Sequence, residues 1–238
     1  MGRVAALLAL LGLLFGYDEA APHLWHQGLW WDVAWIAVVL IPGTFALMLV
    51  ALPFWRARWL LPAGLAFVVL AAVLQVANQE ISANFARLGA TMLLGWYFLS
   101  FFETAAWVVL VACVIPWVDA YSVWRGPTKA IVTHHAHVFT LLSFAFPVPG
   151  ERAAAHLGLT DLLFFALFLG AAARFGLRIL ATWVGLAAGL GATIALTVWW
   201  NLSGLPALPG IALGFLLPNA DLLWRQLRPR VTTEVPAP

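Results

Sequence analysis

Two aspartates lie in apolar stretches of this chain, Asp119 directly after Ile115-Pro116-Trp117-Val118 and Asp161 directly before Leu162-Leu163-Phe164. An ionisable group at membrane depth costs at least ~2.5 kcal/mol on insertion scales, so it is normally paired, solvated or chemically useful. Two carboxyl groups in one site of low dielectric cannot both ionise, and they share a proton. One can then activate water while the other protonates a carbonyl or leaving group. The pair therefore predicts hydrolysis with Asp119 and Asp161 as catalytic residues, and it requires no cofactor.

Each aspartate taken alone also fits a structural role. A carboxylate at the end of a membrane helix can face headgroup water, and Thr160-Asp161 is a favourable sequence for capping a helix N-terminus. The catalytic interpretation therefore depends on both residues reaching one site.

A histidine cluster indicates a different class of function. His134, His135 and His137 lie close together, His156 follows, and His23 and His26 lie near the N-terminus. Imidazoles at this density can bind zinc, copper or iron, which makes a membrane metalloenzyme an alternative. Their spacing matches no strong metal-binding pattern, so we interpret them as histidines of interfacial loops and expect no metal.

The composition is that of a polytopic membrane protein. Of the 238 residues, 64% are hydrophobic and only 9% are charged, and the net charge of +2 gives no surface for nucleic acid. We expect one transmembrane domain over residues 1–238, in contact with the lipid bilayer. The basic residues divide equally between the two sides of the predicted bundle, so they favour neither orientation.

A helix that spans a membrane needs roughly 20 apolar residues, which predicts an all-α bundle of about seven transmembrane helices. We expect them at residues 3–16, 31–52, 59–77, 91–119, 159–174, 177–200 and 205–224. Residues 1–90 then hold the N-terminal helices, 91–224 the catalytic helices and 225–238 a flexible tail. The apolar part of residues 132–149 is too short to cross, so it predicts an extended or re-entrant segment before the Asp161 helix.

Two further predictions concern packing. Gly185 and Gly189 have the small-xxx-small spacing that lets two membrane helices approach closely. Glu103 falls midway along the predicted helix 91–119, on the face away from Asp119, where we expect polar packing or a second cavity.

Three short motifs carry a resemblance to a known family. They are Asp119-Ala120-Tyr121-Ser122-Val123, then Gly158-Leu159-Thr160-Asp161, and then Pro206-Ala207-Leu208. In this order, over roughly residues 96–224, they resemble the presenilin and signal peptide peptidase family of intramembrane aspartyl proteases. The resemblance implies that Asp119 and Asp161 are the catalytic pair. It also implies that Gly158, Thr160, Pro206, Ala207 and Leu208 shape the site.

The resemblance further implies substrates that are transmembrane segments or signal peptides. In the family, β-structure before the second aspartate binds substrate, which assigns that role here to the segment Phe144–Pro149, including Phe146 and Val148. An exposed edge of this segment would accept a substrate strand. The oligomeric state does not follow from these motifs.

Three departures from the family pattern stand out. Thr160 replaces the second glycine of the family motif, and Val118 replaces a tyrosine that often precedes the first aspartate. The sequence before residue 91 has room for about three helices where the family has five. These departures motivate another alternative, an inactive relative that binds transmembrane helices.

Overall fold

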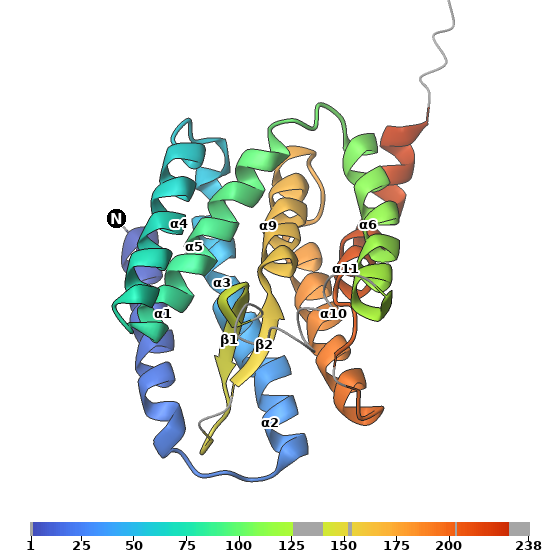
Figure 1. Ribbon diagram of the computed structural model, residues 1–238. Coiled ribbons are helices and arrows are strands. Elements are labelled where there is room, and N and C mark those ends of the chain that lie inside the picture. The colour runs from blue at the N-terminus through green and yellow to red at the C-terminus, as the bar shows by residue number, and fades with distance from the viewer. Residues whose placement is uncertain (1, 126–139, 152–153, 203, 229–238) are drawn as a thin grey trace, which may run out of the picture.

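The computed structural model describes residues 2–125, 140–151, 154–202 and 204–228, which form a bundle of helices with one β-hairpin (Figure 1). In chain order the elements are α1 (Gly2–Ala20), η1 (Ala21–His23), α2 (Leu29–Trp35), the π-helical η2 (Ile36–Leu40), α3 (Ile41–Ala51), η3 (Leu52–Arg56), α4 (Leu60–Val76), α5 (Glu80–Leu99), α6 (Ala105–Arg125), β1 (Ser143–Pro147), β2 (Ala154–Gly158), α9 (Leu159–Arg174), α10 (Ile179–Trp199) and α11 (Leu208–Leu227). Helix α9 lies in the middle of the bundle and is buried along most of its length. The histidines His134, His135 and His137 lie outside the described residues.

The outer surface of the bundle is apolar, as a lipid environment requires. Within the described residues, four helical stretches are long and apolar enough to cross a membrane, namely Gly2–His23, Leu29–Arg56, Ala105–Arg125 and Ile179–Trp199. Large apolar side chains point outward from the bundle, with Val76 85% and Trp117 78% exposed. An apolar surface of this kind marks contact with a membrane. The chain is therefore a multi-pass membrane protein with a helical fold, whereas the prediction of seven spans is not confirmed.

The prediction of one long helix over residues 91–119 is wrong, because α5 ends at Leu99 and α6 begins at Ala105. The backbone N–H groups of Ser100 and Phe102 donate to the carbonyl groups of Tyr97 and Leu99, which closes α5 with short turns. The polar residues Ser100, Glu103 and Thr104 mark this break in the sequence, and only Phe101 and Phe102 continue the apolar run through it.

Two consequences follow from this break. Glu103 is exposed in the connection between α5 and α6, so the prediction of an acid midway along a membrane helix is wrong. Asp119 lies inside α6 instead of closing a helix, and the N-terminal part holds α1, the continuous stretch Leu29–Arg56, α4 and α5 before α6 begins. Three of these, α1, Leu29–Arg56 and α4, end before residue 91, as the sequence predicts, and residue 91 itself lies within α5.

The glycine prediction is confirmed by the contact between α10 and α11. Gly185 lies against Gly214, and Gly189 lies against Gly210. A Cβ atom added at Gly189 would be 2.2 Å from the Gly210 carbonyl oxygen, and one added at Gly185 would be 2.4 Å from the Gly214 carbonyl oxygen. The two backbones touch directly, so the position of α11 depends on the absence of side chains at these residues.

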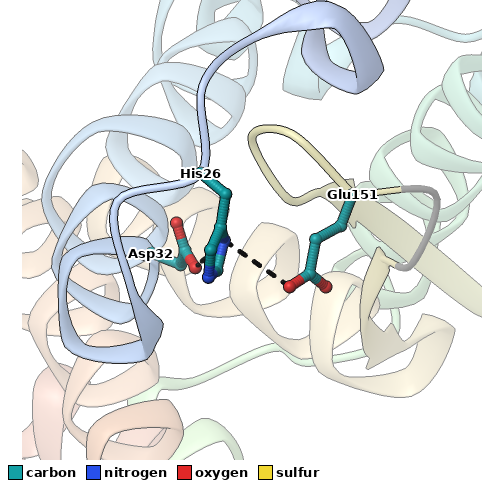
Figure 2. A group of neighbouring side chains, drawn as sticks. All are labelled: His26, Asp32 and Glu151. Atoms are coloured by element: carbon teal, nitrogen blue, oxygen red, sulfur yellow. Dashed lines mark ion pairs between the residues drawn. The ribbon is translucent and has the colours of Figure 1, made fainter.

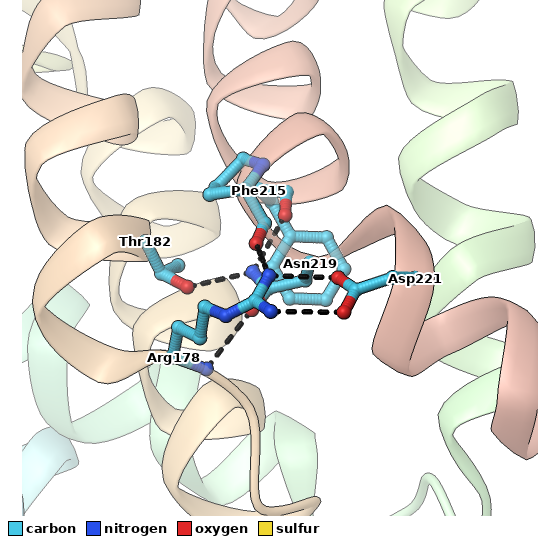
Figure 3. A network of polar contacts seen from close by, with 6 residues as sticks. Arg178, Thr182, Phe215, Asn219 and Asp221 are labelled. Atoms are coloured by element: carbon cyan, nitrogen blue, oxygen red, sulfur yellow. Dashed lines mark hydrogen bonds and ion pairs between the residues drawn. The ribbon is translucent and has the colours of Figure 1, made fainter.

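A polar network joins α10 to α11 near the start of α10 (Figure 3). Asn219 is fully buried: its side-chain oxygen accepts the backbone N–H of Arg178 at 2.9 Å, and its side-chain amide donates to Thr182 Oγ1 at 2.7 Å and to the Phe215 carbonyl at 2.8 Å. The guanidinium of Arg178 forms a two-bond ion pair with Asp221 at the exposed side of the same network. Asn219 thus supplies a hydrogen-bond acceptor for the backbone N–H of Arg178, the residue just before α10.

Replacing Asn219 by alanine is expected to lower the free energy of unfolding by about 2 kcal/mol, because three hydrogen bonds are lost and the buried Thr182 hydroxyl loses its partner. Asp221→Ala is the matched control on the same helix, and its effect should be far smaller, since water screens the exposed ion pair. Unfolding in detergent measures both, and equal losses would contradict the assignment of the stabilisation to Asn219.

Candidate active site

The predicted Pro206-Ala207-Leu208 motif lies against the half-buried Asp119. Leu208 is the first residue of α11, and its backbone N–H donates to Asp119 Oδ2 at 3.0 Å. This N–H has no partner within its own helix, and the N-terminus of a helix carries a partial positive charge. The loop that begins α11 therefore presents a donor to the Asp119 carboxylate, and Ala207 and Leu208 are both buried there, 7% and 3% exposed.

Asp161 is in the first turn of α9 and is 8% exposed. A Cβ atom added at Gly158 would be 3.1 Å from Asp161 Oδ2, so the absence of a side chain at Gly158 leaves room for the carboxylate. Thr160 is exposed beside it, and its Oγ1 would be 3.4 Å from the same Cβ position.

The two aspartates lie on helices that contact each other, Asp119 on α6 and Asp161 on α9. The Asp119 carboxylate is near enough to that of Asp161 for the two to interact electrostatically. The chain runs through α6 in one direction and through α9 in the other, which places the end of α6 at the level where α9 begins (Figure 1). With the Asp119–Leu208 bond, all three motifs of the sequence meet at one site, which holds two carboxyl groups and one backbone donor.

The β-hairpin leads directly into this site. Strands β1 and β2 pair antiparallel, with Ser143 opposite Gly158 and Pro147 opposite Ala154. Gly158 is both the last residue of β2 and the N-cap of α9. Only Leu159 and Thr160 therefore separate the hairpin from Asp161. The predicted extended segment is confirmed over Ser143–Pro147.

The outer edge of β1 is occupied by side chains, so the prediction that a substrate strand joins an exposed edge of this segment is wrong. Three carbonyl groups along this edge each accept a hydrogen bond from α1 or α5. The bonds are Tyr17 Oη to the Pro147 carbonyl (3.3 Å), Asn84 Nδ2 to the Ala145 carbonyl (2.8 Å) and Arg87 Nη1 to the Ser143 carbonyl (3.3 Å). The Ala145 N–H also donates back to Asn84 Oδ1 at 2.9 Å, which imitates a neighbouring strand. Strand addition to this hairpin is therefore restricted to the β2 side.

Phe146 and Val148 do not face an open cleft. The ring of Phe146 is 2% exposed and packs edge-on against Phe144, with 4.9 Å between the ring centroids. Val148 is half-buried against the same core. Both side chains support the hairpin from the interior of the bundle.

His156 belongs to the hairpin. Its Nδ1 lies 2.8 Å from Ser143 Oγ across the two strands. Partial burial of the ring, together with the positive charge of Arg87, lowers the pKa of His156. In the described part of the chain, His156 therefore acts as a hydrogen-bonding residue of the hairpin.

A groove that the sequence did not predict lies between α4, α5 and the chain on either side of the hairpin. Its volume is ≈ 490 Å³, and its walls are mostly apolar. Leu142 and Leu159 close one side, and Leu159 is two residues before Asp161. The hydropathy of α4 and α5 did not predict this groove, because apolar residues are found both in a groove and on a surface that contacts lipid.

A scan against models of known protein families finds no match for this chain, and neither does a search of curated proteins. The geometry of the two aspartates is accordingly the main basis for a functional proposal.

Proposed function

We propose that this protein is an intramembrane aspartyl protease that hydrolyses peptide bonds within transmembrane segments or signal peptides, with Asp119 and Asp161 as its catalytic pair. The observation that carries the proposal is the convergence at one site of Asp119, Asp161 and the Leu208 N–H. These are the three places at which the sequence resembles the presenilin and signal peptide peptidase family.

The proposed mechanism uses one water molecule and the proton that the two carboxyl groups share. The Leu208 N–H can only donate, so it holds Asp119 as a hydrogen-bond acceptor, and Asp119 takes a proton from the attacking water. Asp161 gives the shared proton to the carbonyl oxygen, which forms a tetrahedral diol. Transfer of the Asp119 proton to the leaving nitrogen then breaks the C–N bond, and the diol proton returns to Asp161. The reaction consumes one water and needs no metal or organic cofactor.

The apolar groove beside Leu159 supports a transmembrane segment as the substrate. Its ≈ 490 Å³ can hold several apolar side chains, and it is lined by helices α4 and α5 together with Leu142 and Leu159. In our proposal the substrate lies along this groove and reaches Asp161 past the hairpin, so the groove selects apolar sequence.

Thr160 favours a second function, an inactive relative that binds transmembrane helices without cleaving them. Its exposed side chain stands beside Asp161 at the position of the family's second glycine. Bulk at this point would narrow the approach of a substrate backbone to the carboxyl pair.

The test is cleavage of a model transmembrane substrate, in membranes, by the wild type and by Asp119→Ala. We expect the wild type to cut within the apolar segment and an aspartyl transition-state analogue to block it. We expect Asp119→Ala to be inactive, since the water-activating carboxylate is gone.

Glu103→Gln is the matched control, because it removes an exposed acid that lies just before α6 and far from any proposed chemistry. It should cleave like the wild type. Equal cleavage by the wild type and Asp119→Ala would refute the protease proposal. A wild type that is silent and binds the substrate would favour the second function.

A further inference from the structure

A second group of ionisable side chains, His26, Asp32 and Glu151, lies at the turn of the hairpin (Figure 2), whereas Asp161 follows the opposite end of β2. His26 comes from the connection between η1 and α2, Asp32 from α2, and Glu151 from the turn that follows β1. His26 Nδ1 is 3.3 Å from Asp32 Oδ2 and 3.5 Å from Glu151 Oε1. Two carboxylates thus converge on one imidazole nitrogen from segments far apart in the chain.

The Asp32 carboxylate is buried and incompletely paired. Asp32 is 3% exposed, and its Oδ1 is buried without a hydrogen-bond partner among the described residues. A proton on His26 Nδ1 could serve at most two acceptors, and it leaves Asp32 Oδ1 unsatisfied. A buried carboxylate with an unpaired oxygen is costly, which indicates that a cation belongs beside it.

The separations match those between the ligands of a small divalent ion. Zinc binds histidine nitrogen and carboxylate oxygen at roughly 2.0–2.2 Å, which puts neighbouring ligand atoms of a tetrahedral site about 3.3–3.5 Å apart. The two distances from His26 Nδ1 fall in this range. One ligand atom from each of the three residues lies within 4.8 Å of the others. One nitrogen and two carboxylate oxygens are a donor set that zinc and its neighbours accept.

The backbone holds the three residues in place. Gly150 has a φ of +74°, a left-handed conformation that favours glycine. A Cβ atom at this position would be 2.6 Å from the backbone nitrogen of His26. The Gly150 N–H donates to the Ala21 carbonyl at 2.8 Å, which ties the turn before Glu151 to the first residue of η1. The site is therefore preorganised by main-chain contacts, as a metal site requires.

We propose that His26, Asp32 and Glu151 bind one divalent metal ion of the zinc type. The ion ties the connection between η1 and α2 to the turn of the β-hairpin, and the hairpin continues into Asp161. It takes no part in the hydrolysis proposed above, since its ligands lie at the turn of the hairpin and Asp161 follows the opposite end of β2, and its role is to hold the hairpin against the N-terminal helices.

The test is a titration of the full-length protein with Zn²⁺ alone, after treatment with a chelator, in competition with a chromophoric zinc indicator. We expect the wild type to bind one equivalent tightly. His26→Ala and Glu151→Gln should weaken this equivalent by at least ~100-fold, because each removes a ligand. The Glu151 side chain is 44% exposed, so Glu151→Gln is expected to fold normally.

His23→Ala is the matched control, since His23 is exposed and lies in η1 next to the same connection. This variant should still bind one equivalent of Zn²⁺ tightly. That result would show that the tight binding does not come from the neighbouring exposed histidine. Hydrogen exchange at Val148–Glu151 should slow when Zn²⁺ binds the wild type and stay unchanged in Glu151→Gln. A wild type without a tight equivalent, or a Glu151→Gln that binds as the wild type does, overturns the proposal. Neither measurement depends on proteolysis.

Discussion

Asparagine in place of Asp161 is expected to reduce cleavage of a transmembrane substrate by at least ~10³-fold while leaving the thermal stability of the bundle unchanged. General acid–base groups contribute roughly 10²–10⁴-fold to a rate, and the loss of the shared proton removes the contribution of the pair as a whole. Asparagine cannot supply that proton at any accessible pH.

The stability half of this prediction follows from where Asp161 lies. It is 8% exposed, near a second carboxyl group, and the burial of two such groups together opposes folding. It also occupies the first turn of α9, where an acceptor beside the helix N-terminus stabilises the helix. Asparagine keeps an acceptor of nearly the same shape and cannot carry a charge, so the thermal stability of the bundle should not fall.

Asp161→Asn therefore separates catalysis from helix capping. If Asp161 is only a cap, Asp161→Asn retains its function and Asp161→Ala lowers the melting temperature. If Asp161 is catalytic, both variants are inactive, whatever their melting temperatures. Cleavage and thermal unfolding of the three proteins, measured in the same membranes, decide between these outcomes. An active Asp161→Asn would exclude Asp161 as a proton donor.

Asp119 and Asp161 could be singled out from the sequence because their signals are local: each stands out by the cost of a charge among apolar neighbours. The last helix was predicted to begin at residue 205, whereas α11 begins at Leu208, just after Pro206. Each signal needs only a few adjacent residues. The Leu208–Asp119 bond then follows, since a helix N-terminus offers N–H groups to whatever carboxylate lies near it.

The errors arose where the answer depends on distant residues. The edge of β1 is occupied by Tyr17, Asn84 and Arg87. The hydropathy of their helices does not indicate which carbonyl groups these polar side chains bind. The break between α5 and α6 is a different case, because its signal was local: Ser100, Glu103 and Thr104 mark it, and they were interpreted as part of one long apolar helix.

The group of His26, Asp32 and Glu151 could not have been predicted from the sequence. Glu151 lies about half the chain away from Asp32, and it reaches His26 and Asp32 because the hairpin turn is hydrogen-bonded to the first residue of η1. The sequence did single out His26 among the histidines near the N-terminus, but nothing in it pointed to Asp32 and Glu151 as its neighbours.

Alanine in place of Gly189 is expected to lower both stability and activity, although Gly189 touches neither aspartate. Its Cβ would be 2.2 Å from the Gly210 carbonyl oxygen, so α10 and α11 must move apart. Such overpacking costs about 1–3 kcal/mol. Gly210 is in the first turn of α11, two residues after Leu208, so the shift also moves the N–H that binds Asp119.

Gly185→Ala is the matched control because it creates the same clash one turn of helix further from the site. Its Cβ would be 2.4 Å from the Gly214 carbonyl oxygen, and Gly214 is one turn beyond Gly210 on α11. The two variants should lose similar stability. A displacement of about 1 Å in a catalytic group can cost ~10²-fold in rate, so Gly189→Ala should lose more activity per unit of lost stability. If cleavage falls equally in both variants, the effect is one of bundle stability, and the Leu208–Asp119 hydrogen bond does not position the catalytic carboxylate.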